Sequence, residues 1–278
     1  MTSAETNVDA QPLGIVTMTL MALAVGLVAG FGAVLFRGLI AFFHNLLFRG
    51  QIAFIYDANV HSAASPWAAG VVLVPVVGAV GVAFLVKMFA PEAKGHGVPE
   101  VMDAIYYDSG RIRPVVAVVK SMASALSIGS GGAVGREGPI IQIGSAFGST
   151  LGQVIRMPDH QRVTLVAAGA AGGIAATFNT PIGGLVFAIE LLLPAVNATT
   201  LLPVALATVT ATYVGRYFLG LQPALNTPEL MIPSVHLDSV AEYPCYVVLG
   251  LLIGLLGTLL TRAIYWSEDR FDALPGNY

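Results

Sequence analysis

Apolar and polar residues follow one another along this chain in blocks, and the longest apolar blocks are sized to cross a membrane. A helix needs about 20 apolar residues to span the hydrocarbon core of a bilayer. Blocks of roughly this length or more predict membrane helices at 13–48, 67–90, 200–220 and 243–266. The first block exceeds the thickness of the bilayer, so we expect its helix to tilt strongly or to protrude.

The middle of the chain carries shorter helical segments that Gly and Pro separate. The pattern predicts helices at 99–108, 115–128, 139–156, 161–177 and 181–193. Several of them are too short to cross a bilayer. Non-helical backbone persists in a membrane only where protein or a water-filled cavity satisfies its polar groups, and broken helices that meet near the midplane are typical of transporters and channels. The pattern therefore predicts an all-α integral membrane protein of that type.

Composition supports a multi-pass membrane protein and excludes several other classes. The chain is 56% hydrophobic and 10% charged, with a mean hydropathy of +0.78. A net charge of −3 gives no reason to expect a nucleic-acid partner. The single cysteine, Cys245, excludes an intrachain disulfide and a cysteine-based zinc site, and no metal or other cofactor is expected. Residues 1–12 are polar and lack a basic run, so we expect a disordered tail rather than a signal peptide.

The candidate chemistry lies in two Gly/Pro breaks that each precede a predicted helix. They read Gly95-His96-Gly97-Val98-Pro99 and Gly135-Arg136-Glu137-Gly138-Pro139. Glycine lets backbone N–H groups approach a ligand closely, and Pro is suited to the first turn of a helix. Two helix N-termini that face one cavity would stabilise an anion without a full positive charge. This predicts an anion site that both breaks line.

Glu137 stands at one of these N-termini and is itself an anion. It could occupy the site as a tethered competitor and leave on protonation or displacement; the alternative is that it only stabilises the dipole of its own helix. Arg136 would either attract anions or pair with an acid such as Glu100 or Asp103. Those two acids are otherwise expected on the solvated or paired face of the short helix 99–108.

Three motifs together resemble one known family. GREGP at 135–139, GHGVPE at 95–100 and FNTPIGGLVFAIE at 178–190 are similar in type, order and spacing to motifs of the CLC chloride channels and chloride/proton antiporters. The resemblance implies a broken-helix, inverted-repeat fold and a homodimer with one chloride pathway per subunit. It implies that Glu137 is the gate, that the amides around 135–139 line the outer part of the pathway, and that those around 95–99 line the inner part.

This chain departs from the family pattern at two positions. His96 stands where the family usually has Ser; it could alter the choice of anion or the pH dependence, or point away so that only the backbone matters. Leu191 stands where antiporters carry a second, proton-conducting glutamate, which favours a channel. A shift of one residue in the alignment would instead make Glu190 the proton-carrying acid, and Glu190 could also be an ordinary charge at a helix end.

The chain corresponds to only part of the family pattern. Residues 13–220 resemble the first repeat, 221–242 a loop, and 243–278 the first helix of a truncated second repeat, with no GxFxP motif. We therefore expect a chloride channel with a glutamate gate in a lipid bilayer, the bacterial inner membrane. The alternatives are a chloride/proton antiporter and a truncated, non-conducting subunit. An enzyme is not expected, because no nucleophile–base pair is present.

Overall fold

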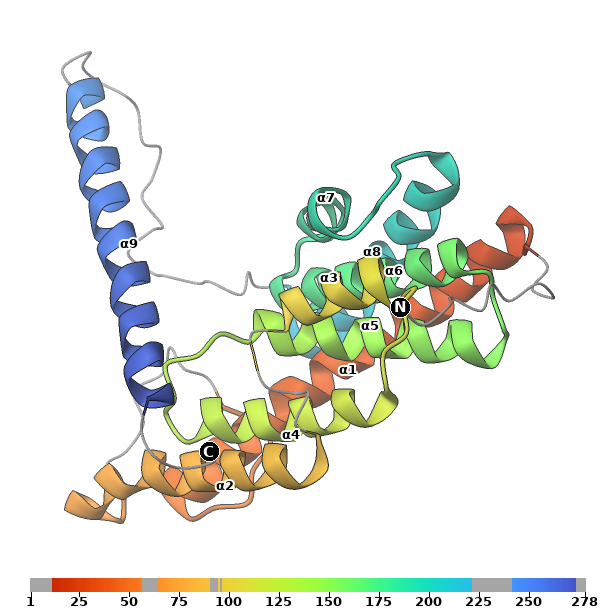
Figure 1. Cartoon of the computed structure of the whole chain (residues 1–278). Helices are drawn as coiled ribbons and strands as arrows, with labels where there is room; N and C mark the ends of the chain where they lie inside the picture. Colours follow the sequence, from red (N-terminus) through yellow and green to blue (C-terminus); the bar gives the residue numbers. More distant parts are fainter. Residues whose placement is uncertain (1–11, 57–64, 91–94, 96, 222–241, 274–278) are drawn as a thin grey trace. The chain divides into compact units, whose positions relative to one another are not determined.

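The computed structural model describes residues 12–56, 65–90, 95, 97–221 and 242–273. The chain divides into two units, Met1–Asn226 and Thr227–Tyr278. All regular structure in the described residues is helical (Figure 1). Most of the predicted tail 1–12, the position His96 and almost all of the predicted loop 221–242 lie outside the described residues. The predicted repeat boundaries stay a prediction.

The helices of the first unit follow the predicted blocks closely. They are α1 Ile15–Arg49, η1 Ala68–Leu73, α2 Val74–Phe89, α3 Val98–Tyr107, α4 Pro114–Gly129, α5 Glu137–Val154, α6 Asp159–Phe178, α7 Pro181–Leu191 and α8 Ala198–Leu219. The second unit contains α9, Glu242–Asp272, which is several residues longer than predicted. The block 67–90 starts as a 3-10 turn, η1, and becomes α-helical from Val74.

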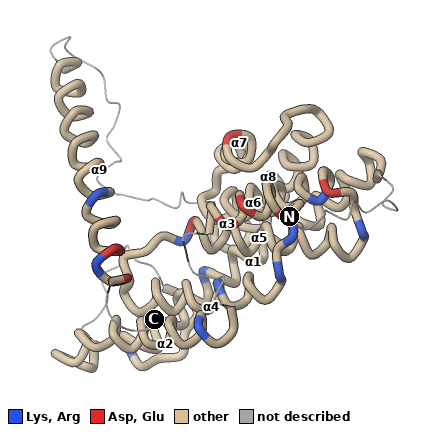
Figure 2. The backbone as a smooth tube through the Cα atoms, in the orientation of Figure 1, with Lys and Arg blue, Asp and Glu red and all other residues tan. Residues whose placement is uncertain are grey.

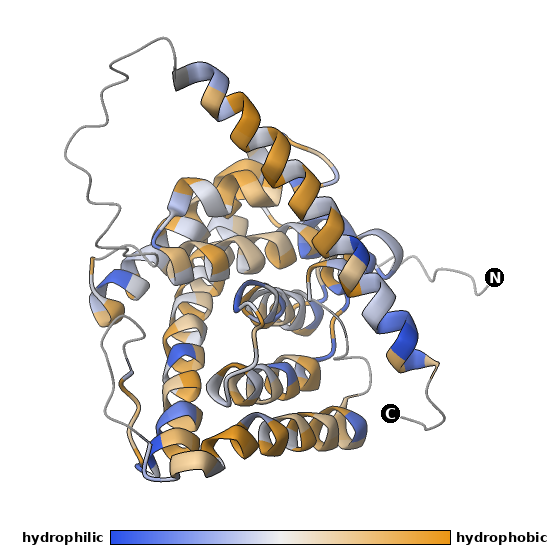
Figure 3. Ribbon diagram, turned by 90° about the vertical axis from the view of Figure 1, so that its left-hand side faces the viewer, coloured by the Kyte–Doolittle hydropathy of each residue, from blue (hydrophilic) through white to orange (hydrophobic). Residues whose placement is uncertain are grey.

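The described helices include four that are long and apolar enough to cross a membrane. These are Ile15–Arg49, Ala68–Phe89, Ala198–Leu219 and Tyr243–Asp272, in agreement with the four predicted spans. Figure 2 shows that charged positions are sparse along the helices. Figure 3 shows that apolar residues dominate the long helices. Large apolar side chains such as Leu35 and Tyr213 are exposed on α1 and α8, as lipid contact requires.

Helix α6 lies at the centre of the first unit, where it packs against α1, α5, α7 and α8. Its buried face is built from Ala and Gly. A Cβ atom on Gly144 of α5 would collide with the carbonyl oxygen of Gly169 of α6, and a Cβ on Gly169 would collide with that of Gly144. Small residues let membrane helices approach closely. This close contact of α5 and α6 sets the position of the first turn of α5.

Two predicted helix starts are wrong by a few residues. Helix α5 begins at Glu137 rather than at Pro139, because a proline is tolerated anywhere in a first turn whose N–H groups have no helical partner. Helix α6 begins at Asp159 rather than at residue 161, and Pro158 precedes it. The Asp159 carboxylate accepts a hydrogen bond from Arg162 at 2.7 Å.

Candidate functional site

The two Gly/Pro breaks meet through their glycines. Gly97 is buried, has φ of +95°, and immediately precedes α3. A Cβ atom at residue 97 would stand 2.6 Å from the carbonyl oxygen of Gly138 and 3.0 Å from its Cα. Only glycine combines this positive φ with such a close approach. The N-terminal turns of α3 and α5 are therefore in direct backbone contact. An anion site that both Gly/Pro breaks line needs such proximity and stays a prediction.

A glutamate and a lysine hold the loop in front of α3. The Glu100 carboxylate accepts a hydrogen bond from the N–H of Gly97 at 2.7 Å. The Nζ of Lys120, which is only 5% exposed on α4, donates to the carbonyl oxygen of Gly95 at 2.6 Å. Glu100 was expected on the solvated or paired face of this helix, and its carboxylate is paired with the N–H of Gly97 at the start of α3. The Gly97 N–H is therefore already occupied.

Sequence reasoning missed Lys120 as part of this site. The signal was present, because Lys120 is the only charged residue in the apolar segment 114–129. Ionisable side chains inside membrane helices are costly and usually have a specific partner. Here that partner includes the Gly95 carbonyl, in the loop before α3.

Helix α5 presents free backbone donors at its start. Ile140 is the first residue of the helix to donate to a carbonyl, that of Arg136, at 3.3 Å. Pro139 has no N–H, so the donors of this first turn that have no partner among the described residues are the N–H groups of Glu137 and Gly138. The Glu137 side chain is exposed and its carboxylate folds back against Gly135. The gate candidate thus lies beside the donors without a hydrogen bond to a described residue.

Arg136, the residue before α5, stacks on an aromatic ring. Its guanidinium carbon lies 5.3 Å from the centre of the Phe178 ring at the end of α6. The predicted pairing of Arg136 with Glu100 or Asp103 is not among the ion pairs of the described residues.

The third motif begins at Phe178, the last residue of α6. Asn179 follows it with φ of +57°, and the Thr180 hydroxyl accepts a hydrogen bond from the N–H of Gly183 at the start of α7.

Glu190 and Leu191 end α7 in different surroundings. Glu190 is exposed and makes no hydrogen bond or ion pair with another described residue. Leu191 packs against the main hydrophobic core of the unit. The resemblance drawn from the sequence implies a proton-carrying acid at position 191, where this chain has the packed, apolar Leu191, and the neighbouring acid Glu190 is exposed.

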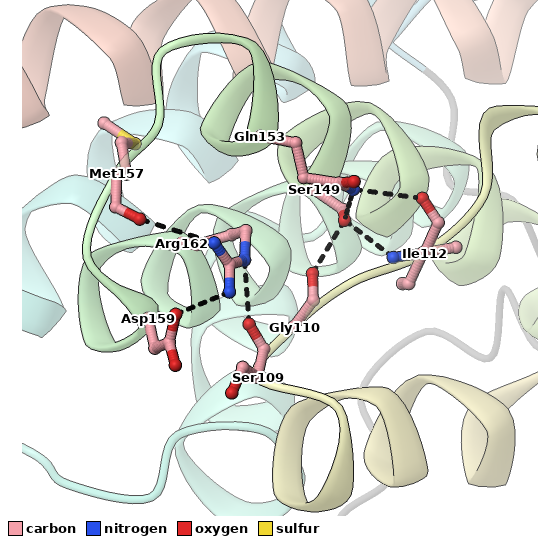
Figure 4. A network of polar contacts seen from close by, with 8 residues as sticks. All are labelled: Ser109, Gly110, Ile112, Ser149, Gln153, Met157, Asp159 and Arg162. Carbon is pink, nitrogen blue, oxygen red and sulfur yellow. Dashed lines mark hydrogen bonds and ion pairs between the residues drawn. The ribbon is translucent and has the colours of Figure 1, made fainter. Parts of the chain in front are cut away.

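The loop after α3 is tied down by a polar network (Figure 4). Arg162, at 3% exposure, donates to the carbonyl oxygens of Ser109 at 2.8 Å and Met157 at 3.3 Å, and to Asp159. Burial by itself raises the pKa of Asp159, but a hydrogen bond with Ser109 and the charges of Arg162 and Arg111 outweigh it and hold the pKa below its usual value. The carboxylate therefore stays ionised beside Arg162.

Helix α5 supplies the other half of this network. The Ser149 hydroxyl donates to the carbonyl of Gly110 at 2.7 Å and accepts the N–H of Ile112 at 2.8 Å. Gln153 donates to Ser149 at 2.8 Å and to the Ile112 carbonyl at 3.3 Å. Both ends of α3 are thereby fixed to neighbouring helices. These contacts hold both ends of α3 while its start lies against Gly138.

One buried side chain near the start of α5 lacks a hydrogen-bond partner among the described residues. Gln142 lies one turn beyond Gly138 on α5 and is 3% exposed, yet its Oε1 has no hydrogen-bond partner in the described structure. No group of three or more His, Cys, Asp or Glu that could hold a metal ion occurs among the described residues.

Known proteins are similar to this chain in sequence and in fold. The sequence model of the family "Voltage gated chloride channel" matches residues 77–277. The H(+)/Cl(-) exchange transporter ClcA of Vibrio parahaemolyticus is 31% identical over 268 residues, which are 94% of this chain and 54% of that protein. The chain thus spans about half the length of the curated relatives that it matches.

Solved structures agree at the level of the fold. The crystal structure of a slow cyanobacterial Cl−/H+ antiporter superimposes with a TM-score of 0.75 and 26% identity, covering 95% of this chain and 60% of that chain. A CLC-type fluoride/proton antiporter superimposes with a TM-score of 0.67 over 87% of this chain and 56% of that chain. At 24% identity, the second likeness concerns the fold alone.

Proposed function

The chain belongs to the family of voltage-gated chloride channels, and from this premise we propose that it moves chloride across a membrane in exchange for protons. The observation that carries the proposal is the contact of Gly97 with Gly138, which brings two helix starts together beside Glu137. The similar proteins named above are exchangers by name, so exchange takes precedence over the channel expected from the sequence.

The anion would bind at the first turn of α5. The free N–H groups of Glu137 and Gly138 are directed out of the helix, and the helix dipole adds to their attraction. Gly97 contributes shape rather than a donor, because its N–H is bound to Glu100. A site made of backbone dipoles binds an anion firmly enough to admit it and weakly enough to release it. The Glu137 carboxylate competes for the same donors and leaves when it is protonated.

Two residues would divide the transport cycle between them. Glu137 exchanges places with chloride at one end of the pathway, and Glu190 delivers protons from the other side. Glu190 is the candidate because it is exposed at the end of α7, whereas the side chain of Leu191 cannot carry a proton and packs in the core.

The surroundings of the protein are also part of the proposal. The four apolar helices support residence in a lipid bilayer, and the bacterial exchangers among the similar proteins support the plasma membrane. A homodimer is proposed on the family resemblance; Ile182 of α7 and Val209 of α8 are exposed apolar residues on helices that such an interface could use.

Reconstituted liposomes test this function directly. We expect chloride efflux from the chain to be altered strongly by Glu137→Ala and Glu137→Gln, which remove the competing carboxylate, and to be unchanged by Asp103→Asn, a matched exposed acid on α3. Any longer natural product that contains this chain should be assayed in parallel. Absence of chloride flux from both, or an equal effect of all three substitutions, would contradict the proposal.

Proton movement separates exchange from passive conduction. A chloride gradient should drive protons uphill in the unaltered protein, and Glu190→Gln should reduce proton flux while chloride flux continues. Chloride flux without proton movement would instead support a channel.

A further inference from the structure

The loop 50–56, which follows α1, folds back against the helix that precedes it. Its first residue is a glycine with φ of +65°, a left-handed conformation that ends the helix and turns the chain. The ring of Phe54 stacks on that of Phe42, with centroids 5.3 Å apart. A second stack joins Tyr56 to His44, with centroids 3.8 Å apart. The loop therefore lies beside the last two turns of α1.

Asn45 binds this loop from α1. Its side chain is 1% exposed, and Nδ2 donates to the carbonyl oxygens of Ala53 at 3.1 Å and Ile55 at 3.0 Å. The N–H of Gln51 donates in turn to the Asn45 carbonyl at 3.1 Å. The side-chain amide thus spends its two protons on main-chain carbonyls that water would satisfy in an ordinary exposed loop. Non-helical backbone needs such internal partners where it leaves water for lipid.

The side chains that this loop presents outwards are apolar. Ile52 is 78% exposed, Phe54 61% and Ile55 88%. A single exposed apolar residue is ordinary, but a group of them marks an interaction surface. The loop 50–56 also contains no charged residue, so no charge opposes its transfer into an apolar phase.

Trp67 links the end of α1 to the start of the next apolar helix. The span Ala68–Phe89 begins directly after it, and its Nε1 donates to the Leu47 carbonyl at 2.8 Å. Trp side chains favour the boundary between membrane and water. From the level of Leu47 back to that of Phe42 is about 7.5 Å along the α1 axis, at 1.5 Å per residue. Apolar faces of interfacial segments enter the headgroup–acyl boundary to a similar depth.

We propose that the loop 50–56 is an interfacial anchor, whose Ile52, Phe54 and Ile55 side chains enter the lipid bilayer at the headgroup–acyl boundary. Lipid is the partner because the loop adjoins two of the helices that are long and apolar enough to cross a membrane, carries no charge and has two of its carbonyls satisfied by Asn45. The anchor goes beyond the proposed transport function and does not depend on it.

The length of α1 gives such an anchor a purpose. Its 35 residues extend about 52 Å, whereas the hydrocarbon core of a bilayer is about 30 Å thick. A helix with this excess tilts or protrudes, and its tilt is set by packing and by interfacial side chains. An anchor at residues 50–56 would fix the level of one end of α1.

Spin labels measure the depth of the loop directly. The full chain carries Cys245→Ser, which removes its only cysteine, together with Ile55→Cys or the matched control Gln51→Cys from the same loop. Each nitroxide-labelled protein is reconstituted into vesicles of phosphatidylethanolamine and phosphatidylglycerol. Power-saturation EPR then compares collisions with oxygen, which partitions into the bilayer, and with a water-soluble nickel chelate. We expect the ratio of oxygen to nickel collisions to be several-fold higher at position 55 than at position 51.

Two results of this measurement would overturn the anchor. Nickel access at position 55 equal to that at position 51 would place the side chain in water. Exclusion of both oxygen and nickel from position 55 would show that protein rather than lipid covers it. Chloride flux plays no part in the readout, so the anchor and the transport function succeed or fail separately.

Asn45→Leu tests how the loop is held at this depth. The substitution keeps a side chain of similar size but leaves the carbonyls of Ala53 and Ile55 without their donor. The label at position 55 should then gain nickel access, because unsatisfied carbonyls favour water. Arg49→Gln is the control, since the Arg49 guanidinium contacts Oδ1 of Asn45 and not the loop carbonyls; it should leave the ratio unchanged. An equal ratio in Asn45→Leu and the unaltered protein would overturn the role of Asn45.

Discussion

Gln142 and Gln153 lie about three turns apart on α5, and their amide groups are in opposite situations. Gln153 is exposed and donates to Ser149 and to the carbonyl of Ile112. Gln142 is buried, and its Oε1 lacks a partner in the described structure. A buried acceptor without a donor costs free energy, whereas an apolar group of similar shape at the same place does not. The two glutamines on one helix therefore allow a comparison between an amide with hydrogen bonds and an amide oxygen without one.

We expect Gln142→Leu to leave the free energy of unfolding unchanged or to raise it. Gln153→Leu should lower it by about 0.5–1 kcal/mol, because it removes hydrogen bonds that water can partly replace. Thermal unfolding of both purified variants in the same detergent measures the difference. If Gln142→Leu were the more destabilised variant, Oε1 would have to bind a donor in the protein under those conditions.

The residues of the site differ in how far the sequence could identify them. Glu137, Gly97 and Gly138 follow from glycines and charges at predicted helix starts. The hydrogen bond from Lys120 to the Gly95 carbonyl and the presence of Arg37 near Arg136 do not. Both depend on which helix faces meet in space, and residues on separate helices carry no local signal of their partner.

At the scale of elements, helix lengths and breaks follow local chemistry, which explains why they could be predicted. Apolar blocks and prolines set most boundaries to within a few residues. The observed starts of α5 and α6 lie two residues before the predicted ones, because Pro139 is tolerated inside a first turn and Asp159 pairs with Arg162 one turn along the same helix. The packing order around α6 could not be predicted, since Ala and Gly are compatible with many neighbours.

The crossing of α5 and α6 offers the sharpest test at this scale. Gly144→Ala should destabilise the chain by about 1–3 kcal/mol or more, because its Cβ would collide with the backbone of Gly169 and force the helices apart. Gly38→Ala is the control: it lies within α1, has no atom within 4 Å of an added Cβ, and gains helix propensity of about 1 kcal/mol. Thermal melting followed by circular dichroism checks both. Equal melting temperatures for the two variants would show that the helices can separate at little cost.

For the whole molecule, the site depends entirely on the first unit. The residues that hold the loops before α3 and α5 come from positions 95 to 138, and Arg37 of α1 lies within the same unit. The buried residues of all three hydrophobic clusters lie between Met18 and Ala211. None of the described residues of α9 is buried. The fold that positions the site therefore has its own core.

This independence predicts the outcome of a truncation. A chain that ends at Asn226 should keep a cooperative thermal transition and its helical signal per residue, because the buried residues of the three hydrophobic clusters all lie within it. A chain that ends before Ala198 should not, since α8 contributes Val204, Ala207 and Ala211, which are fully buried against α1 and α6. Limited proteolysis and thermal unfolding in one detergent compare the three lengths. A clear fall in melting temperature on removal of α9 alone would show that α9 stabilises the first unit by contact in the folded protein, and the first unit could then no longer be treated as a self-sufficient scaffold for the two helix starts.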